Sequence, residues 1–208
     1  MQIRTFPLGP LQTNCYLISG NGRALVIDPG GDPAPLLALL ESEGLTLANI
    51  LNTHLHFDHI LGNAALSAAT GAAILASQAD EFLLSSEVGG GGFMGLPTVE
   101  RFAFQAIAPG DTSLLDLPCR ILATPGHSPG SLSFYFPDLR TVFVGDLIFF
   151  RSVGRTDFPG GDFETLQQSV MNQIFTLPPE VAILAGHGPQ STVANEKMHN
   201  PFFSQFQC

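Results

Sequence analysis

Alternating apolar and polar residues predict a chain of short strands joined by turns rich in glycine and proline. The first three predicted strands are rich in β-branched and aromatic residues, and Gly-Pro and Gly-Asn-Gly separate them. Similar short apolar runs recur along the whole chain. The predicted strands cover residues 2–7, 13–19, 23–28, 48–52, 73–76, 103–107, 112–115, 119–123, 131–136, 141–145 and 181–185.

Helices are expected where leucines and other apolar residues recur every three or four positions. The first helix begins after Asp32, its predicted N-cap, and ends at Gly44. Four consecutive glycines interrupt the pattern within residues 86–97, where a flexible surface loop is predicted. The other predicted helices cover Ile60 to Ala69, ended by Gly71; residues 78–85; and residues 163–176, begun by Asp162.

The order of these elements indicates the fold class. In each half of the chain strands come first and helices after them, without a short-period sequence repeat. This order favours two similar α/β units stacked sheet to sheet. With 208 residues, of which 45% are hydrophobic and 12% charged, the chain is expected to form a single domain over residues 1–208.

Net charge excludes one class of partner. The chain has 18 acidic and 8 basic side chains, a net charge of −10, and Lys197 as its only lysine. Because phosphate binding needs clustered Lys and Arg, no nucleic-acid partner is expected. No apolar run approaches the roughly 18 residues of a membrane span, so no membrane partner is expected either. The sequence carries no signal of an oligomeric state.

The N-terminus and the cysteines predict a cytoplasmic protein. Residues 1–10 lack the apolar core of a signal peptide. The three cysteines, Cys15, Cys119 and Cys208, are an odd number and have no CxxC spacing. They are interpreted as free thiols in a reducing compartment.

Five of the six histidines fall into a pattern of metal-ligand type. Residues 53–59 read Thr-His-Leu-His-Phe-Asp-His, and three further residues follow in Thr-Pro-Gly-His-Ser, Val-Gly-Asp and Gly-His-Gly-Pro. Imidazole and carboxylate together are the ligand set that Zn, Fe and Mn sites select. The predicted metal ligands are His54, His56, Asp58, His59, His127, Asp146 and His187.

Each predicted ligand follows the end of a predicted strand, where a rigid sheet edge can hold ligands while loops leave coordination positions open. His54 and His56 are two residues apart, so in extended backbone their side chains point the same way. With His127 they form one three-imidazole set for a first metal ion.

The remaining ligands suit a second ion. Asp58 and His59, where the loop turns into the next helix, form a second set with His187, and the two oxygens of Asp146 are expected to bridge the ions. Two divalent cations about 3.5–4 Å apart hold a water between them and lower its pKa toward neutrality. The expected cofactor is two divalent metal ions, Zn²⁺ first, with Fe and Mn as alternatives.

The order of these motifs resembles that of the metallo-β-lactamase fold superfamily, over essentially the whole chain. The resemblance implies a four-layer αββα sandwich with the site at one end of two facing sheets. It also implies that Asp28, in Val-Ile-Asp-Pro-Gly, lies near the metals, although a plain turn residue at a strand end is an equal alternative.

Within the superfamily the chain is most similar to glyoxalase II, the hydroxyacylglutathione hydrolases, in its short single-domain bacterial form. The similar segments are Leu11-Gln-Thr-Asn-Cys-Tyr-Leu, residues 124–131 and residues 144–146. Asp146 argues against the zinc β-lactamases, which have a cysteine for the second metal. The resemblance matches Arg155 to a basic position that contacts substrate; pairing with Asp157 or Asp162 is the alternative.

Three features depart from the long glyoxalase II enzymes. Only 21 residues follow His187, so their C-terminal helical, glutathione-binding domain is not expected. Asp157 stands where those enzymes have an aromatic residue, and Pro189 stands where they have a tyrosine.

The predicted function is hydrolysis of a small-molecule thioester, such as S-lactoylglutathione, by a hydroxide that bridges the ions. Asp58 has the predicted catalytic role, because it accepts a hydrogen bond from that water and so orients it. Two alternatives stay open. One is a mononuclear-iron enzyme resembling the persulfide dioxygenases, which Gly154-Arg155-Thr156-Asp157-Phe158 favours, and the other is a lactone or ester hydrolase.

Overall fold

The computed structural model describes residues 1–206, and the chain divides into two compact units. Unit 1 comprises Met1–Ile107 with Leu114–Asp116, and unit 2 comprises Ala108–Ser113 with the chain from Leu117 onward. A six-stranded sheet and several helices belong to each half of the chain. The predicted fold class, α/β with two sheets and helices, is therefore confirmed, and the single domain over residues 1–208 stays a prediction.

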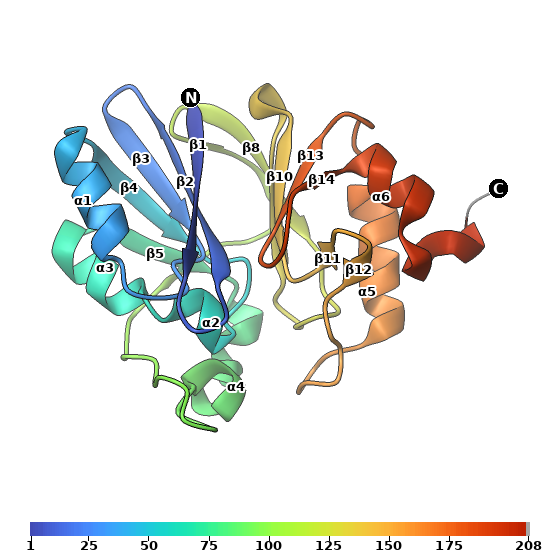
Figure 1. The fold of residues 1–208 in the computed structure, drawn as a ribbon, viewed down its shortest axis with the longest axis horizontal. Helices are drawn as coiled ribbons and strands as arrows, with labels where there is room; N and C mark the ends of the chain where they lie inside the picture. The colour runs from blue at the N-terminus through green and yellow to red at the C-terminus, as the bar shows by residue number, and fades with distance from the viewer. Residues whose placement is uncertain (207–208) are drawn as a thin grey trace. The chain divides into compact units, whose positions relative to one another are not determined.

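Unit 1 builds its sheet in sequence order, β1-β2-β3-β4-β5-β6. Short turns make β1, β2 and β3 antiparallel, whereas longer connections with helical segments make β3 to β6 parallel. Helices α1 and α3 cover one face of this sheet (Figure 1). The elements are β1 (Gln2–Leu8), β2 (Thr13–Gly20), β3 (Arg23–Ile27), α1 (Ala34–Ser42), β4 (Thr46–Leu51), α2 (Phe57–Ile60), α3 (Asn63–Thr70), β5 (Ala73–Ala76), η1 (Gln78–Ser85), α4 (Glu87–Gly90) and β6 (Gln105–Ala106).

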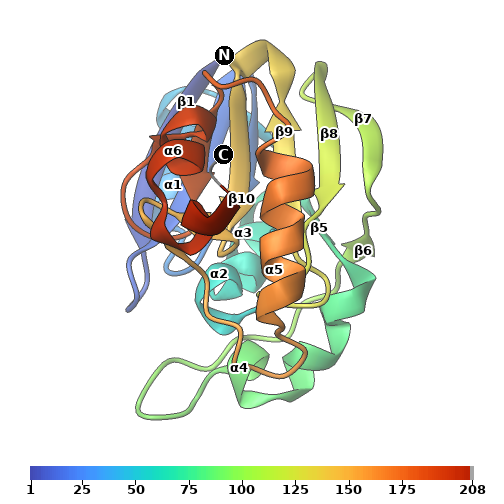
Figure 2. The ribbon, with the colours of Figure 1, turned by 90° about the vertical axis from the view of Figure 1, so that its right-hand side faces the viewer.

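The second sheet has the order β14-β13-β10-β9-β8-β7, in which β10 and β13 are parallel. Helices α5 and α6 lie on one face of it, as Figure 2 shows. A separate two-stranded hairpin, β11–β12, follows β10. The elements are β7 (Gly110–Leu114), β8 (Leu117–Ala123), β9 (Leu132–Phe136), η2 (Pro137–Leu139), β10 (Thr141–Gly145), β11 (Ile148–Phe149), β12 (Ser152–Val153), α5 (Phe163–Ser169), η3 (Val170–Ile174), β13 (Ala182–Ala185), β14 (Ser191–Thr192), α6 (Val193–His199) and η4 (Pro201–Phe206).

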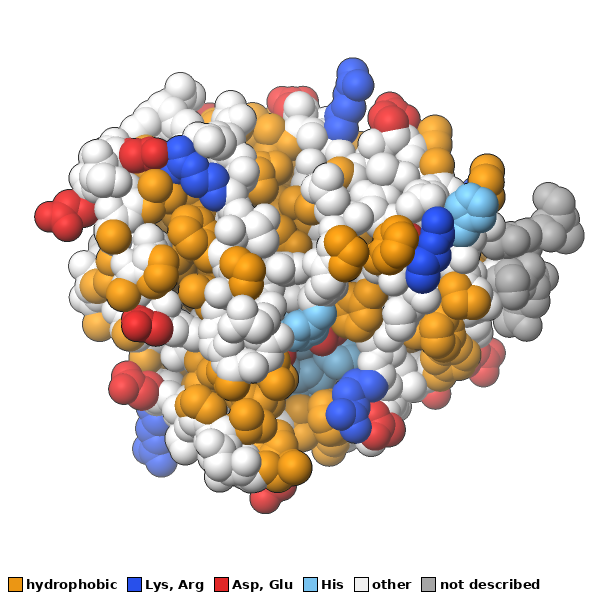
Figure 3. Space-filling view, in the orientation of Figure 1, with side chains coloured by type: hydrophobic (Ala, Val, Ile, Leu, Met, Phe, Trp, Pro, Cys, Tyr) orange, Lys and Arg blue, Asp and Glu red, His pale blue; other side chains and the backbone are white. Residues whose placement is uncertain are grey.

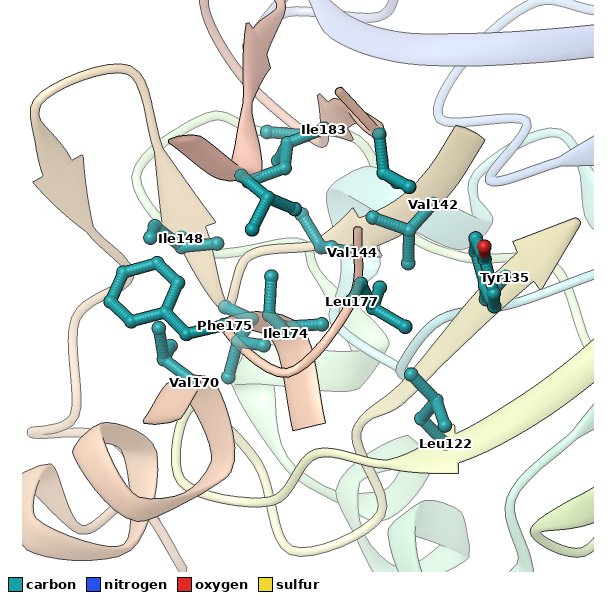
Figure 4. Packing of buried hydrophobic residues seen from close by; sticks show 14 of the residues in the cluster. Leu122, Tyr135, Val142, Val144, Ile148, Val170, Ile174, Phe175, Leu177 and Ile183 are labelled. Carbon is teal, nitrogen blue, oxygen red and sulfur yellow. The ribbon is translucent and has the colours of Figure 1, made fainter. Parts of the chain in front are cut away.

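Side chains from the strands and helices of unit 2 pack into one apolar cluster (Figure 4). Val142 and Val144 of β10 and Ile183 of β13 face Val170 and Ile174 of η3, and none of the five is more than 1% exposed. Burying a branched aliphatic side chain contributes roughly 1.5–3 kcal/mol. This cluster therefore holds the α5–η3 segment on the sheet.

Replacing Ile174 by alanine is expected to lower the free energy of unfolding by roughly 2–5 kcal/mol, because the cavity left in this cluster adds to the lost burial. Urea denaturation followed by circular dichroism measures the change. Met198→Ala, at a side chain of α6 that is 63% exposed, is the matched control and should stay within about 0.5 kcal/mol of wild type. Equal losses in the two variants would contradict the assignment of this core.

The strand predictions agree with the structure to within two residues at each end, and 73–76 and 141–145 match completely. The helix predicted from Ile60 to Ala69 and ended by Gly71 is confirmed over α3, but its predicted start is wrong, since residues 61–62 separate α2 from α3. The segment 78–85 is helical but of the 3₁₀ type, and the helix predicted over 163–176 changes to a π-helix at Val170. The predicted loop 86–97 contains the short helix α4.

The two described cysteines are buried free thiols, and Cys208 lies outside the described residues. Burial raises the pKa of Cys119 to about 12 and raises the pKa of Cys15 well above its usual value. Because only the thiolate reacts, a Cys208→Ser variant is expected to show no thiol reactive toward Ellman's reagent at pH 8 when folded. The same variant should show both thiols in denaturant, and a fast-reacting thiol in the folded protein would contradict the burial.

Basic side chains lie singly, not in a patch, on the face that Figure 3 shows. Several arginines form ion pairs with carboxylates, among them Arg4 with Glu43 and Arg120 with Asp111. Within residues 1–206, no helix has the length and apolar character needed to cross a membrane. The expected absence of nucleic-acid and membrane partners and the cytoplasmic location stay predictions.

Candidate metal centre

The four predicted ligands of unit 1 lie on one segment that follows β4. Because β3 and β4 are parallel, they end at the same edge of the sheet, and the residues that follow them, Asp28 and Thr53, come together there. His56 is the N-cap residue of α2, and that helix carries the last two ligands in its single turn. All four ligands, which are His54, His56, Asp58 and His59, are at most 6% exposed.

The structure brings these four side chains together. The ring centroid of His54 lies 4.6 Å from that of His56 and 4.1 Å from that of His59. The Nε2 atom of His59 lies 3.6 Å from Oδ2 of Asp58. The Nε2 atoms of the three histidines are inaccessible to solvent. Unit 1 therefore supplies three imidazoles and one carboxylate at one place.

Asp28 fixes this cluster through three hydrogen bonds. Its Oδ1 accepts from the backbone N–H of Thr53 (2.8 Å), and its Oδ2 accepts from the Thr53 hydroxyl (2.6 Å) and from Nδ1 of His59 (2.9 Å). A carboxylate only accepts, so the Nδ1 of His59 carries its proton and Nε2 has the free lone pair that a metal needs. Asp28 thus positions His59. The alternative, that Asp28 is only a turn residue at the end of a strand, does not account for these hydrogen bonds.

Thr53 determines in the same way which nitrogen of His54 carries the proton. Its hydroxyl proton goes to Asp28, so its oxygen accepts from Nδ1 of His54 at 3.0 Å. The Nε2 atom of His54 is therefore also the one with a lone pair for a metal.

Further buried polar residues support the segment, and sequence reasoning missed them. Oδ2 of Asp80 accepts from the backbone N–H of Leu55, the residue between the first two histidines, at 3.3 Å. The Thr13 hydroxyl donates to Oδ2 of Asp58 at 3.2 Å. The amides of Asn52 and Asn63 bond each other, and Nδ2 of Asn52 donates to the carbonyl of His59. Thr13 lies in the segment Leu11-Gln-Thr-Asn-Cys-Tyr-Leu noted above, whereas Asp80, Asn52 and Asn63 lie in no recognisable motif.

In unit 2 the predicted ligands follow three strands of the second sheet. His127 follows β8, Asp146 follows β10 and His187 follows β13. Oδ2 of Asp146 lies 3.8 Å from Nε2 of His127 and 3.6 Å from Nε2 of His187. The structure thus brings the three together, with the carboxylate between two imidazoles.

Residues 154–155, which follow β12, contact these ligands. Nδ1 of His127 donates to the carbonyl of Arg155 at 2.7 Å, which again leaves Nε2 for a metal. Gly154 passes so close to Asp146 that an added Cβ would lie 1.7 Å from its carbonyl oxygen. The ring of Phe149 packs edge to face on His187, with centroids 6.0 Å apart.

The side chain of Arg155 is engaged within its own loop. Its guanidinium donates two hydrogen bonds of 2.7 Å to Asp157 and lies 3.8 Å from the ring centroid of Phe158. This pairing holds the pKa of Asp157 at about 2. Asp162 instead caps α5 by accepting from the N–H of Thr165. Contact of Arg155 with substrate stays a prediction, beside the observed pair with Asp157.

The donor sets of both units fit divalent metal ions. Each combines imidazoles with a carboxylate, the set that Zn, Fe and Mn accept. Hydrogen bonds at Nδ1 of His54, His59 and His127 direct their Nε2 atoms toward a ligand, as is usual for metal-binding histidines.

Comparisons with known proteins agree with this chemistry. Residues 8–187 match the family described as the metallo-beta-lactamase superfamily. The chain is 35% identical over 209 residues to a hydroxyacylglutathione hydrolase of Haemophilus influenzae, with coverage of 98% of this chain and 99% of that protein. It superimposes on the BLEG-1 B3 metallo-beta-lactamase with a TM-score of 0.91 at 34% identity, covering 98% and 100% of the two chains. With the protein TTHA1623 in a di-iron-bound form the TM-score is 0.86 at 36% identity, with coverage of 96% and 99%.

Proposed function

This chain belongs to the metallo-β-lactamase superfamily of metal-dependent hydrolases, and we propose that it cleaves a small-molecule thioester with two metal ions. The observation that carries the proposal is the ligand chemistry of each unit: imidazoles fixed through Nδ1 beside a carboxylate. The similarity to a hydroxyacylglutathione hydrolase favours S-lactoylglutathione, or a related acyl thiol, as the substrate.

All seven residues serve one centre in this proposal. His54, His56 and His127 would hold one ion, Asp58, His59 and His187 would hold the other, and Asp146 would be the ligand shared by the two. Family membership and the donor set within each unit support our proposal that the seven residues form a single centre.

When bound, a pair of divalent ions lowers the pKa of a water and polarises a carbonyl group. Hydrolysis adds the elements of water across the carbonyl carbon–sulfur bond, giving a carboxylic acid and a thiol. Asp58, held by the Thr13 hydroxyl, accepts a hydrogen bond from the attacking water and orients it toward the carbonyl carbon. Arg155 binds a carboxylate of the substrate by exchanging it for Asp157.

Zinc is the proposed metal, and the similarity to a protein solved with two irons makes iron the alternative. The metal is identified by elemental analysis of the purified protein. Removal of the metal with a chelator should abolish hydrolysis, and readdition of the native metal should restore it.

A substrate panel tests the reaction. The metal-loaded protein is assayed for thiol release from S-lactoylglutathione and from a simple acyl thiol, for opening of a lactone and of a β-lactam, and for oxygen consumption with glutathione persulfide. We expect the highest kcat/KM on a thioester. A β-lactam preference would instead follow the similarity to the B3 enzyme, and oxygen consumption with one iron per chain would indicate the dioxygenase alternative. Either result would contradict the proposal.

A further inference from the structure

One buried carboxylate in unit 2 has no part in the reaction proposed above. Glu196, in the first turn of α6, is 0% exposed. A buried carboxylate costs several kcal/mol unless hydrogen-bond donors surround it. The donors that compensate for its burial therefore show which segments it holds together.

Three segments supply these donors. The Ser191 hydroxyl, on β14, donates to Oε1 of Glu196. Oε2 accepts from the backbone N–H of Arg151 and from Nδ2 of Asn200, both at 2.9 Å. Arg151 lies in the turn of the β11–β12 hairpin, and Asn200 follows α6 directly. The carboxylate thus joins the hairpin to α6 and β14.

The hairpin depends on this junction for its conformation. Arg151 has a φ of +59°, a left-handed conformation that costs energy for a non-glycine residue. Its guanidinium also donates to the carbonyl and side-chain oxygens of Asn195, the neighbour of Glu196. Asn200 Nδ2 reaches the carbonyl of Ser152 at 3.0 Å, so both the turn and the second strand of the hairpin are held.

The same hairpin contacts the metal-ligand residues of unit 2. Phe149, on its first strand, packs against His187. Gly154, directly after its second strand, lies against Asp146, and the next carbonyl, that of Arg155, accepts from His127. A displacement of the hairpin would therefore reach all three ligands.

We infer that Glu196 is a positioning residue for the metal centre: it fixes the β11–β12 hairpin, and the hairpin fixes the imidazoles of His127 and His187. The inference rests on the proposed function in requiring a metal at these ligands. Its readout is metal affinity and not hydrolysis, so the two can fail separately.

The experiment measures Zn²⁺ affinity of the full-length protein by competition with a chromophoric chelator, beside the free energy of unfolding. Glu196→Ala is expected to weaken Zn²⁺ binding by up to roughly 10-fold, less than the 10–100-fold loss on removing a direct partner of a ligand, because Glu196 acts through the hairpin. Glu196→Gln should restore affinity close to wild type. Its carbonyl still accepts from Arg151 and Asn200, and its amide donates to the Ser191 oxygen, which accepts as readily as it donates.

The core variant Phe136→Leu is the matched control. It destabilises the same unit, but Phe136 packs against Phe143 and lies outside the apolar cluster that includes the hairpin. It should bind Zn²⁺ as the wild type does. If Glu196→Ala also binds Zn²⁺ like the wild type, its role is merely structural and the inference is overturned. If that variant does not fold, Asn200→Ala decides: weaker Zn²⁺ binding supports the inference and unchanged binding overturns it. A wild-type protein that binds neither Zn²⁺ nor Fe²⁺ overturns both proposals.

Discussion

Replacing Asp146 by alanine is expected to lower the kcat of thioester hydrolysis roughly 10³-fold, since a metal centre supplies several kcal/mol of transition-state stabilisation. The carboxylate of Asp146 lies between Nε2 of His127 and Nε2 of His187, and in our proposal it is the ligand that both ions share. Its loss removes one bond to each ion at once. Elemental analysis should therefore show fewer than two ions per chain, and steady-state kinetics should show the loss in kcat.

The matched control is Asp111→Ala, which removes a carboxylate that is 81% exposed and pairs with Arg120 at the surface. Such an exposed pair contributes about 0–1 kcal/mol, so this variant should keep its metal, its stability and its rate. A protein with Asp146→Ala that retained both ions and the wild-type kcat would show that this aspartate does not bridge them.

Local sequence pattern was sufficient for most of the fold. Strands β5 and β10 are short apolar runs bounded by turn residues, and both boundaries of each were predicted. The start of α5 was also predictable, because Asp162 caps it by accepting from the N–H of Thr165. In these places the residues that determine the structure are neighbours in the chain.

The break between α2 and α3 depends on residues far away in the sequence. The N–H of Gly62 donates to the carbonyl of Pro29, and a Cβ at Gly62 would lie 2.4 Å from the carbonyl of Gly31. Asn63, the first residue of α3, bonds the side chain of Asn52. These tertiary contacts overrode the continuous apolar pattern from Ile60 to Ala69. The two-residue strands β11, β12 and β14 were too short to give any periodic signal.

At the site, the metal ligands could be predicted from the sequence, but the residues that position them could be identified only in the structure. Histidines and aspartates in metal-ligand spacing are recognisable because few other chemistries need them. Asp80 and Glu196 are ordinary acidic residues in the sequence, and only their burial and their bonds to backbone N–H groups show which segments they hold. Thr53 is the first residue of the segment 53–59, and its position beside His54 was the only sequence signal for its supporting role.

The second large effect is expected from Asp28→Asn. Asparagine tolerates the left-handed φ of +51° at this position, and its oxygen can still accept from the N–H of Thr53, so the fold should survive. The amide nitrogen, however, only donates, and it would face Nδ1 of His59 where an oxygen now accepts at 2.9 Å. The imidazole then carries its proton on Nε2, the atom that must bind the metal.

The Asp28→Asn protein should accordingly bind Zn²⁺ roughly 10–100-fold more weakly than the wild type, with a parallel loss of hydrolysis. Asp32→Asn is the matched control. The predicted N-cap role of Asp32 is wrong, because Pro33 is the N-cap residue of α1. The exposed Asp32 carboxylate accepts from the N–H of Ala34, and an asparagine oxygen accepts equally well. Nitrogen-15 NMR of the ring of His59 in the metal-free protein measures the tautomer directly. A proton still on Nδ1 in Asp28→Asn, together with unchanged Zn²⁺ affinity, would mean that Asp28 does not determine how this histidine meets the metal.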